Sequence, residues 1–287
     1  MADNEIRQFD NSAWMSSVPG IDNLKLIDIV WPGAHNAGMD KKAPNHDAAV
    51  GIWTNCQNDS FSWQLVNGAR AFDIRLGYAA NRKQPFYFHH NGFRSPRELN
   101  ELIDAVIMFL ARNPDEFIVL DFHQLGDGAK DFDYKALSEL LVHRLGPRVL
   151  RRSDAAKTLG EIKRSSTLRR IIMAALVQPE MDIDYFWPPI PHKWHKSTFS
   201  SVAEVRRLVA KTVEEAPYRT PFLWSLSVTS YSVIGPVRIP SVIDNWFSRT
   251  QDVTSRCSII NTDFFDESDI VRHCADATRI KAARDDD

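Results

Sequence analysis

The sequence is poor in cysteine. Only three cysteines occur in 287 residues, Cys56, Cys257 and Cys274, and no two of them form a C-x-x-C pair. An odd and sparse set of this kind argues against a disulfide framework and favours a reducing compartment.

The chain also lacks a long apolar run. The apolar stretch at 171–177, which no other exceeds in length, is far too short to cross a bilayer. The first residues, MADNEIRQFDNSAW, are polar and lack the apolar run of a signal peptide. We therefore expect no transmembrane segment and only peripheral contact with a membrane. The expected location is the cytoplasm, or outside the cell after export without a recognisable signal peptide.

Neither sign of charge dominates. The chain carries 35 Lys and Arg against 37 Asp and Glu, a formal net charge of -2. A nucleic-acid partner would call for a basic stripe, so we expect no such partner.

What the chain does contain is a repeated alternation of a short apolar strand with an amphipathic helix. The strands are expected at 25–30, 70–74, 86–89, 117–122, 170–177, 222–228 and 258–263. Alternation of this kind predicts a parallel sheet, and at this length an irregular (β/α) TIM-like barrel forming one domain over residues 1–287. An open doubly wound sheet is the alternative, but no G-x-G-x-x-G loop supports it.

The clearest helix follows Ser95-Pro96-Arg97-Glu98, which has the pattern of a capping box with proline at the first helical position. Apolar residues at helical spacing continue from Leu99 to Leu110, and Asn113-Pro114 ends the pattern.

Polar side chains cluster where the expected strands end. They are His35 and Asn36, then Asp73 and Arg75, then His89 and His90, then Asp121 and His123, and finally Asp263. Barrel enzymes place their chemistry at the C-terminal ends of the strands, so these groups are expected to converge.

Such a set is sufficient to cleave a phosphodiester without a metal. Two histidines titrate near neutrality and can act as base and acid on opposite sides of one phosphate. An arginine between them can neutralise the phosphate through two hydrogen bonds. A carboxylate bonded to one imidazole would fix its tautomer.

Five segments, in this order, resemble motifs of the phosphatidylinositol-specific phospholipase C X-domain family. They are WPGAHNAGM at 31–39, ARAFDIRLG at 69–77, FYFHHNGF at 86–93, EFIVLDFHQL at 116–125 and FWPPIPHKWHKST at 186–198. The resemblance spans nearly the whole chain and implies a barrel that acts on a phospholipid headgroup at a membrane surface. The products it implies are diacylglycerol and an inositol (cyclic) phosphate.

The resemblance also implies roles for individual residues. His35 would be the base that takes the proton from the inositol 2-hydroxyl, and Asp263 would orient it. Arg75 would hold the phosphate oxygens with support from Asp73. A histidine of the third motif would protonate the leaving oxygen. Independently of the resemblance, the place of His123 at a strand end predicts that it lines the pocket and contacts substrate.

Two departures from the family pattern matter. Asn36 stands where the metal-free bacterial enzymes usually have aspartate, and asparagine there is typical of the calcium-dependent enzymes. Arg75, however, stands where those enzymes need a carboxylate ligand, and a guanidinium repels calcium. We therefore expect no metal cofactor, with calcium as the alternative.

The third motif has two adjacent histidines, which alternation along a strand sends to opposite faces. We favour His90 as the acid because it lies nearer the strand end, and we keep His89 as a substrate-binding candidate.

Three further interpretations remain open. A metal-dependent glycerophosphodiesterase-like barrel also uses two histidines, but such enzymes want a Glu-x-Asp pair where this chain has Asp73-x-Arg75. A non-catalytic phosphoinositide-binding protein is the second alternative. Trp187 and Trp194, near the expected mouth of the barrel, are either packed in the loop or in contact with a lipid interface.

Overall fold

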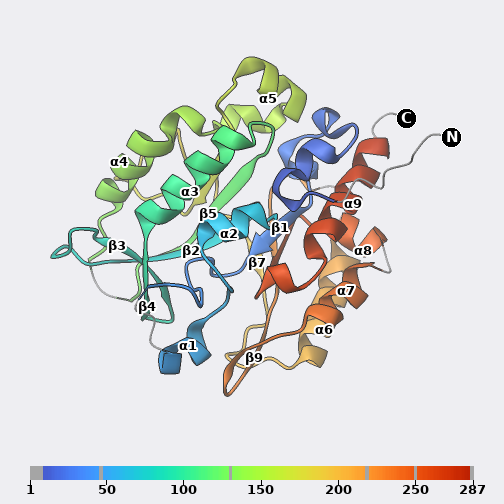
Figure 1. Cartoon of the computed structure of the whole chain (residues 1–287). Coiled ribbons are helices and arrows are strands. Elements are labelled where there is room, and N and C mark those ends of the chain that lie inside the picture. The colour runs from blue at the N-terminus through green and yellow to red at the C-terminus, as the bar shows by residue number, and fades with distance from the viewer. Residues whose placement is uncertain (1–8, 45–47, 129–130, 217–219, 249–250, 285–287) are drawn as a thin grey trace.

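The fold is built around one mixed sheet of nine strands. The computed structural model describes residues 9–44, 48–128, 131–216, 220–248 and 251–284 (Figure 1). The strands of the sheet are β1 (Trp31–Ala34), β2 (Ala71–Tyr78), β3 (Phe86–His90), β4 (Phe93–Glu98), β5 (Ile118–Leu125), β6 (Ile171–Ala175), β7 (His192–Lys193), β8 (Ser225–Val228) and β11 (Ile259–Thr262). A separate two-stranded ribbon pairs β9 (Ser230–Ser232) with β10 (Gly235–Val237).

Seven of the strands are parallel and follow one another in the order β6-β5-β2-β1-β11-β8-β7. The other two depart from that pattern. β3 pairs antiparallel with the second half of β2, beyond the point where β1 ends, and β4 pairs antiparallel with β3. The carboxyl ends of the parallel strands therefore meet at one end of the sheet, as the alternating pattern predicts.

The sheet curves into a TIM-like barrel whose seam lies between β6 and β7. Among the described residues those two strands do not pair directly. An isolated parallel bridge joins Ala174 to Trp187, in which the Trp187 amide donates to the Met173 carbonyl at 2.7 Å. The segment that leads into β7 thus connects the two edges of the sheet.

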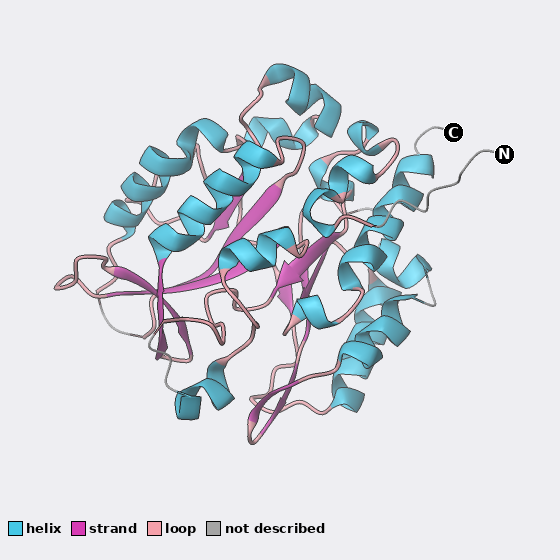
Figure 2. Cartoon of the chain, viewed as in Figure 1, coloured by secondary structure: helices cyan, strands magenta, loops and turns pink. Residues whose placement is uncertain are grey.

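Helices cover the outside of the sheet (Figure 2). Their bounds are α1 (Ala48–Thr54), α2 (Phe61–Val66), α3 (Leu99–Arg112), α4 (Tyr134–Leu145), α5 (Leu159–Ser165), α6 (Val202–Glu215), α7 (Pro240–Ser248), α8 (Gln251–Ser255) and α9 (Ile270–Arg284). Helices α3, α4 and α5 lie on one side of the molecule, and α6 to α9 lie on the other (Figure 1). Of the described residues, no helix is long and apolar enough to span a membrane.

The first strand predicted from the sequence is wrong. Residues 25–30 contain a 3-10 turn, Leu26–Asp28, which the Asp28 carboxylate closes by accepting a hydrogen bond from the Lys25 amide at 3.2 Å. Leu26, Ile29 and Val30 are buried and Ile27 is partly buried, without forming a strand. The true strand is Trp31–Ala34, where Gly33 leaves room for Asn261 on β11, because a Cβ at this position would overlap that side chain.

The predicted start of α3 is also wrong, by one turn. Ser95 to Glu98 lie in β4, and the helix begins at Leu99 with Glu98 as its N-cap. The Glu101 carboxylate completes a capping box, because it accepts a hydrogen bond from the Glu98 backbone amide at 2.9 Å. Pro96 fits in β4 because this is an edge strand, where a missing N–H breaks no ladder.

Candidate active site

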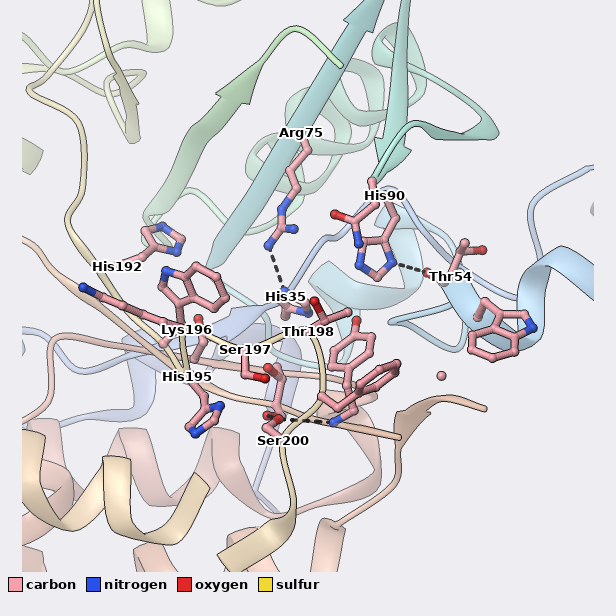
Figure 3. A pocket seen from close by; sticks show the side chains of 18 of the residues that line it. His35, Thr54, Arg75, His90, His192, His195, Lys196, Ser197, Thr198 and Ser200 are labelled. Atoms are coloured by element: carbon pink, nitrogen blue, oxygen red, sulfur yellow. Dashed lines mark hydrogen bonds between the residues drawn. The ribbon is translucent and has the colours of Figure 1, made fainter. Parts of the chain in front are cut away.

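The C-terminal ends of the parallel strands surround a cavity of about 530 Å³. Histidines from four segments reach its wall together with one arginine and one tyrosine (Figure 3). They are His35, His90, His123, His192 with the nearby His195, Arg75 and Tyr231.

His35 follows β1, and its imidazole is held at both ring nitrogens. Nδ1 lies 2.7 Å from Oδ1 of Asp263. The two residues meet because β1 and β11 run in register, with Ala34 opposite Thr262, so the next residue of each strand emerges side by side. Nε2 lies 2.8 Å from Nη2 of Arg75 (Figure 3).

These two contacts define the tautomer of His35. A guanidinium only donates hydrogen bonds, so Nε2 must be the acceptor. The proton of the neutral ring therefore sits on Nδ1 and is donated to the buried Asp263 carboxylate. This tautomer leaves the lone pair on Nε2, where it accepts from Arg75 at the cavity wall and can act as a base once that contact is released.

Arg75 and Asp73 project from the same face of β2, two residues apart. Nε donates to Oδ1 at 3.2 Å and Nη2 donates to Oδ2 at 2.8 Å. Burial would raise the pKa of Asp73, but the charge of Arg75 outweighs it and holds that pKa well below its ordinary value. Asp73 is thus a permanent anion that fixes the guanidinium at the cavity wall.

Asn36 has left-handed backbone geometry, with φ 43. Its amide N–H donates to Oδ2 of Asp73 at 3.1 Å, which turns the chain away from β1. The side chain is fully buried, and neither its oxygen nor its nitrogen has a hydrogen-bond partner among the described residues. Asn36 therefore positions the backbone next to His35 and does not line the cavity.

The two histidines of β3 point to opposite sides, as alternation predicts. His90 lines the cavity, and its Nδ1 lies 3.3 Å from the Thr54 carbonyl (Figure 3). His89 is fully buried outside the cavity lining, where its Nδ1 accepts from the Gly92 amide at 3.4 Å. The structure therefore places His89 away from the site at which substrate contact was expected.

Burial lowers the pKa of His90 to about 3, and the positive charge of Arg75 acts in the same direction. In the free site the ring is neutral near pH 7. Nδ1 carries the proton in that state, because the Thr54 carbonyl can only accept a hydrogen bond.

Two residues that the sequence did not single out complete this side of the site. Tyr231, from β9, presents its ring edge to both catalytic candidates, with centroids 6.4 Å from His35 and 5.7 Å from His90. Its hydroxyl lies 3.1 Å from Sγ of Cys56. Neither residue stands in a motif or at the end of a parallel strand, so nothing in the sequence marks them.

The opposite wall contains a second histidine pair. The imidazoles of His123 and His192 are stacked, with centroids 3.7 Å apart. Nε2 of His192 lies 2.6 Å from Oδ2 of the buried Asp121. Burial alone would lower the pKa of His192, but the bond to Asp121 raises it; burial lowers the pKa of His123 to about 4.

His123 thus lies at the cavity wall, as predicted. Asp121 does not line the cavity itself but forms a hydrogen bond with His192, which does. His192 was overlooked because a single histidine in a proline-rich loop carries no pattern of its own. Its place on β7 becomes apparent only from the pairing with β8.

Four aromatic side chains ring the mouth of the cavity, and each is about half exposed. They are Trp53 at 49%, Phe93 at 52%, Trp194 at 51% and Phe199 at 50%. We refer to these four as the aromatic rim. Trp187 is not part of it, because its indole is 7% exposed and donates to the Leu150 carbonyl at 2.9 Å.

The fold is a TIM-like barrel of the kind found in bacterial phosphatidylinositol-specific phospholipases C. The enzyme of Listeria monocytogenes superposes with a TM-score of 0.70, over 93% of this chain and 98% of that chain, at 16% identity. A Staphylococcus aureus phosphatidylinositol-specific phospholipase C superposes with a TM-score of 0.67, over 90% and 98%, also at 16% identity. The barrel predicted from the sequence is confirmed.

Sequence comparison leads to the same group of proteins. The PI-PLC X domain-containing protein 2 of mouse is 25% identical over 299 residues, which cover 89% of this chain and 84% of that protein. The 1-phosphatidylinositol phosphodiesterase of Staphylococcus aureus (strain Newman) is 28% identical over 120 residues, 42% of this chain and 34% of that enzyme. No protein-family model matches the chain. The resemblance predicted from the five motifs is confirmed: the homologues carry the names of this group.

Proposed function

We propose that the protein is a phosphodiesterase that cleaves phosphatidylinositol-type phospholipids into diacylglycerol and an inositol (cyclic) phosphate. The observation that carries the proposal is the double contact of His35, with Asp263 on Nδ1 and Arg75 on Nε2. This arrangement prepares an unprotonated ring nitrogen beside a cation that binds phosphate.

In the first step His35 removes a proton from the headgroup hydroxyl next to the phosphate. The oxygen attacks phosphorus and a cyclic phosphate forms. As Nε2 takes the proton, the ring becomes an imidazolium, and the Asp263 carboxylate stabilises that charge. The same carboxylate keeps the ring from rotating between turnovers.

Arg75 binds the phosphodiester in this mechanism. Its Nε and Nη2 already donate to Asp73, while Nη1 has no hydrogen-bond partner among the described residues. Nη1 is therefore free to donate to a non-bridging phosphate oxygen. Nη2 moves from the His35 lone pair to a second oxygen, which releases the base when the substrate arrives.

His90 donates the proton to the leaving glycerol oxygen. A general acid must be protonated, whereas the free site holds the pKa of His90 at about 3. A phosphodiester bound beside Arg75 brings a negative charge next to His90 and offsets the positive charge that lowers its pKa. Protonation of the acid is thereby coupled to binding of the substrate.

The aromatic rim supports action at a lipid surface. Indole and phenyl rings partition into the interfacial region of a bilayer, and these four surround the entrance to the cavity. Contact of the rim with the membrane would place the headgroup directly above His35 and His90.

The residues present do not fit a calcium ion at the phosphate site. Both oxygens of Asp73 are bonded to Arg75, and the guanidinium lies where a further oxygen ligand would be needed. We therefore propose a reaction without a metal cofactor, in which Arg75 supplies the positive charge.

The test is release of water-soluble inositol phosphate from phosphatidylinositol vesicles in the presence of EGTA. We expect turnover by the wild type and a loss of at least about 10² for His35→Ala and for His90→Ala. His89→Ala should keep its rate per folded molecule, and His143→Ala, on the exposed side of α4, is the matched control. Binding to vesicles without turnover would support a non-catalytic phosphoinositide-binding protein instead, and activity only with added metal would support a metal-dependent phosphodiesterase.

A further inference from the structure

We propose that His35, Cys56 and Asp263 form an inhibitory site for a thiophilic divalent cation such as Zn²⁺ or Cd²⁺. One ligand atom from each of the three residues lies within 4.8 Å of the others, and all three residues are buried. Sulfur, imidazole nitrogen and carboxylate oxygen are the ligands that zinc takes in proteins. Calcium and magnesium would bind such a mixed set of ligands poorly, since both prefer oxygen ligands.

The three ligands are held by the backbone. Cys56 lies just after α1, and its carbonyl accepts from the Phe264 amide at 2.7 Å, while its amide donates to the Met39 carbonyl at 2.9 Å. The first of these bonds joins the Cys56 loop to the residue that follows Asp263. The thiol and the carboxylate are therefore fixed next to each other before any metal arrives.

The carboxylate has an unused ligand atom. Oδ1 of Asp263 is bonded to His35, but Oδ2 is buried and has no hydrogen-bond partner among the described residues. Asp263 is 7% exposed, so water does not readily compensate for this. A buried carboxylate oxygen left without a partner beside a thiol is a ready ligand for a cation.

The spacing requires little rearrangement. Two ligands at about 2.0–2.1 Å from zinc in a tetrahedral site lie roughly 3.3 Å apart. The ligand atoms of the three residues already lie within 4.8 Å of one another, so the separation of each pair would change by about 1.5 Å or less. The fourth position falls to water or to Nδ1 of His90, which is 4.0 Å from the Cys56 sulfur.

Binding exchanges protons for the metal. The Cys56 thiol loses its proton to solvent and its sulfur binds the cation as a thiolate. The metal takes the Nδ1 lone pair of His35, so the ring proton moves from Nδ1 to Nε2 and the ring stays neutral. No oxidation or reduction takes place, and one proton is released for each ion bound.

The consequence is loss of the base. Once Nε2 carries the proton, it no longer accepts one from the headgroup hydroxyl. The metal also removes the Asp263 carboxylate from the imidazolium that it would stabilise. The cation therefore switches off catalysis without occupying the phosphate position at Arg75.

A second group of possible metal ligands lies on the opposite wall, and the experiment must distinguish metal bound there from metal bound at Cys56. Asp121, His123 and His192 also bring their ligand atoms within 4.8 Å of one another, but they include no sulfur. Metal on that wall would show no thiolate signal, and the stacked rings of His123 and His192 would have to come apart to bind it. The spectroscopic signature of sulfur ligation distinguishes the two.

The first experiment titrates the protein with Cd²⁺ and records the ultraviolet charge-transfer absorbance of a cadmium–thiolate bond. We expect one equivalent to produce the band in the wild type, in Cys257→Ser and in Cys274→Ser, whose changed residues are the other two buried thiols. Cys56→Ser should lack the band. A band that persists in Cys56→Ser, or no band in the wild type, would overturn the proposal.

A second variant guards against misfolding of Cys56→Ser. Asp263→Asn keeps the thiol but replaces a charged ligand, and its apparent Cd²⁺ affinity should fall by at least about tenfold. Circular dichroism checks that each variant is folded. An unchanged affinity in Asp263→Asn would contradict the assignment of this carboxylate as a ligand.

The inhibitory effect rests on the proposed function, so it is measured separately. Zn²⁺ should inhibit cleavage of phosphatidylinositol by the wild type, with reversal by EDTA, at concentrations at least about tenfold lower than for Cys56→Ser. His123→Ala should be inhibited like the wild type, and loss of inhibition there would assign the effect to the other wall. If the protein proves inactive on phosphatidylinositol, the cadmium band still decides whether the site exists.

Discussion

Arg75 donates a hydrogen bond to Nε2 of His35 at 2.8 Å, so the residue proposed to bind phosphate covers the lone pair proposed to act as base. The resting site is thus closed on itself. The guanidinium must shift toward the phosphate before the imidazole accepts a proton, which couples binding to activation. Because Asp73 anchors the guanidinium by two bonds, the shift is a pivot about that carboxylate.

This pivot predicts a defect in Arg75→Lys although the charge is kept. A lysine ammonium has no planar fork with which to hold Asp73 and the phosphate together. We expect the rate of phosphatidylinositol cleavage to fall by about 10² or more, as for loss of a group that stabilises charge in the transition state. Binding to vesicles should change little. A rate within a factor of a few of the wild type would contradict the role given to Arg75.

Asp263→Asn tests the tautomer of His35. The asparagine can present its NH₂ group to Nδ1, which then becomes the acceptor and moves the ring proton to Nε2. Turnover should drop by at least about 10² with no loss of vesicle binding. Asp263→Ala removes the partner without imposing the wrong tautomer and should keep more activity. If Asp263→Ala were instead less active than Asp263→Asn, the tautomer of His35 would not be the property that Asp263 controls.

The buried neutral His90 predicts a specific loss of stability in acid. Its pKa falls from 6.5 to about 3 on folding, so between these values the unfolded chain binds the proton and the folded chain does not. The free energy of unfolding should therefore fall as the pH falls through this window, by up to about 1.4 kcal/mol per pH unit from this one group. His123, with a pKa lowered to about 4, acts in the same direction.

His90→Gln should flatten that dependence. Urea denaturation of the variant at several pH values between 3 and 6.5 should show a smaller slope than in the wild type. His143→Gln, on the exposed side of α4, should leave the slope as it is. Equal slopes in the wild type and in His90→Gln would mean that His90 is not held neutral by the fold.

The aromatic rim predicts a difference between vesicles and dissolved substrate. Trp53→Ala with Trp194→Ala should weaken binding to phosphatidylinositol vesicles and lower the rate on them by roughly tenfold or more, since two half-exposed indoles contribute several kcal/mol of interfacial partitioning. The rate on a short-chain, monomeric phosphatidylinositol should be nearly unchanged. Trp63→Ala is the control, because Trp63 is 46% exposed on α2 but lies outside the rim. An equal effect on both substrates would place the rim in catalysis and not in docking.

The sequence predicted the parts of the fold that follow from local patterns. The apolar pattern from Leu99 to Leu110 correctly located the body of α3, because residues at this spacing lie on one face of a helix and are buried together. The prediction of a strand at 25–30 was wrong because burial of apolar side chains does not by itself make a strand. There the short-range bond between Lys25 and Asp28 produced a turn.

The candidate site was predictable where residues follow the ends of parallel strands. The resemblance to the X-domain family paired His35 with Asp263, although 228 positions separate them in the chain, and the structure brings the two together because β1 and β11 are neighbours in register. Tyr231, Cys56 and His192 could not be found in this way. Tyr231 and His192 reach the cavity through a ribbon and a two-residue strand, and Cys56 lies behind Tyr231 on a loop after a short helix. The positions of these segments depend on tertiary packing.

The seam between β6 and β7 has a consequence for local unfolding. Around Trp187 the segment is tied to β6 through two backbone bonds, with Met173 and Ala175, and β7 pairs with β8 over only two residues. Because so few hydrogen bonds hold it, this side of the barrel should have a lower free energy of local unfolding than the continuous ladders around β2 and β5. Amide hydrogen exchange should therefore be faster at His192 and Lys193 than in the central strands β2 and β5.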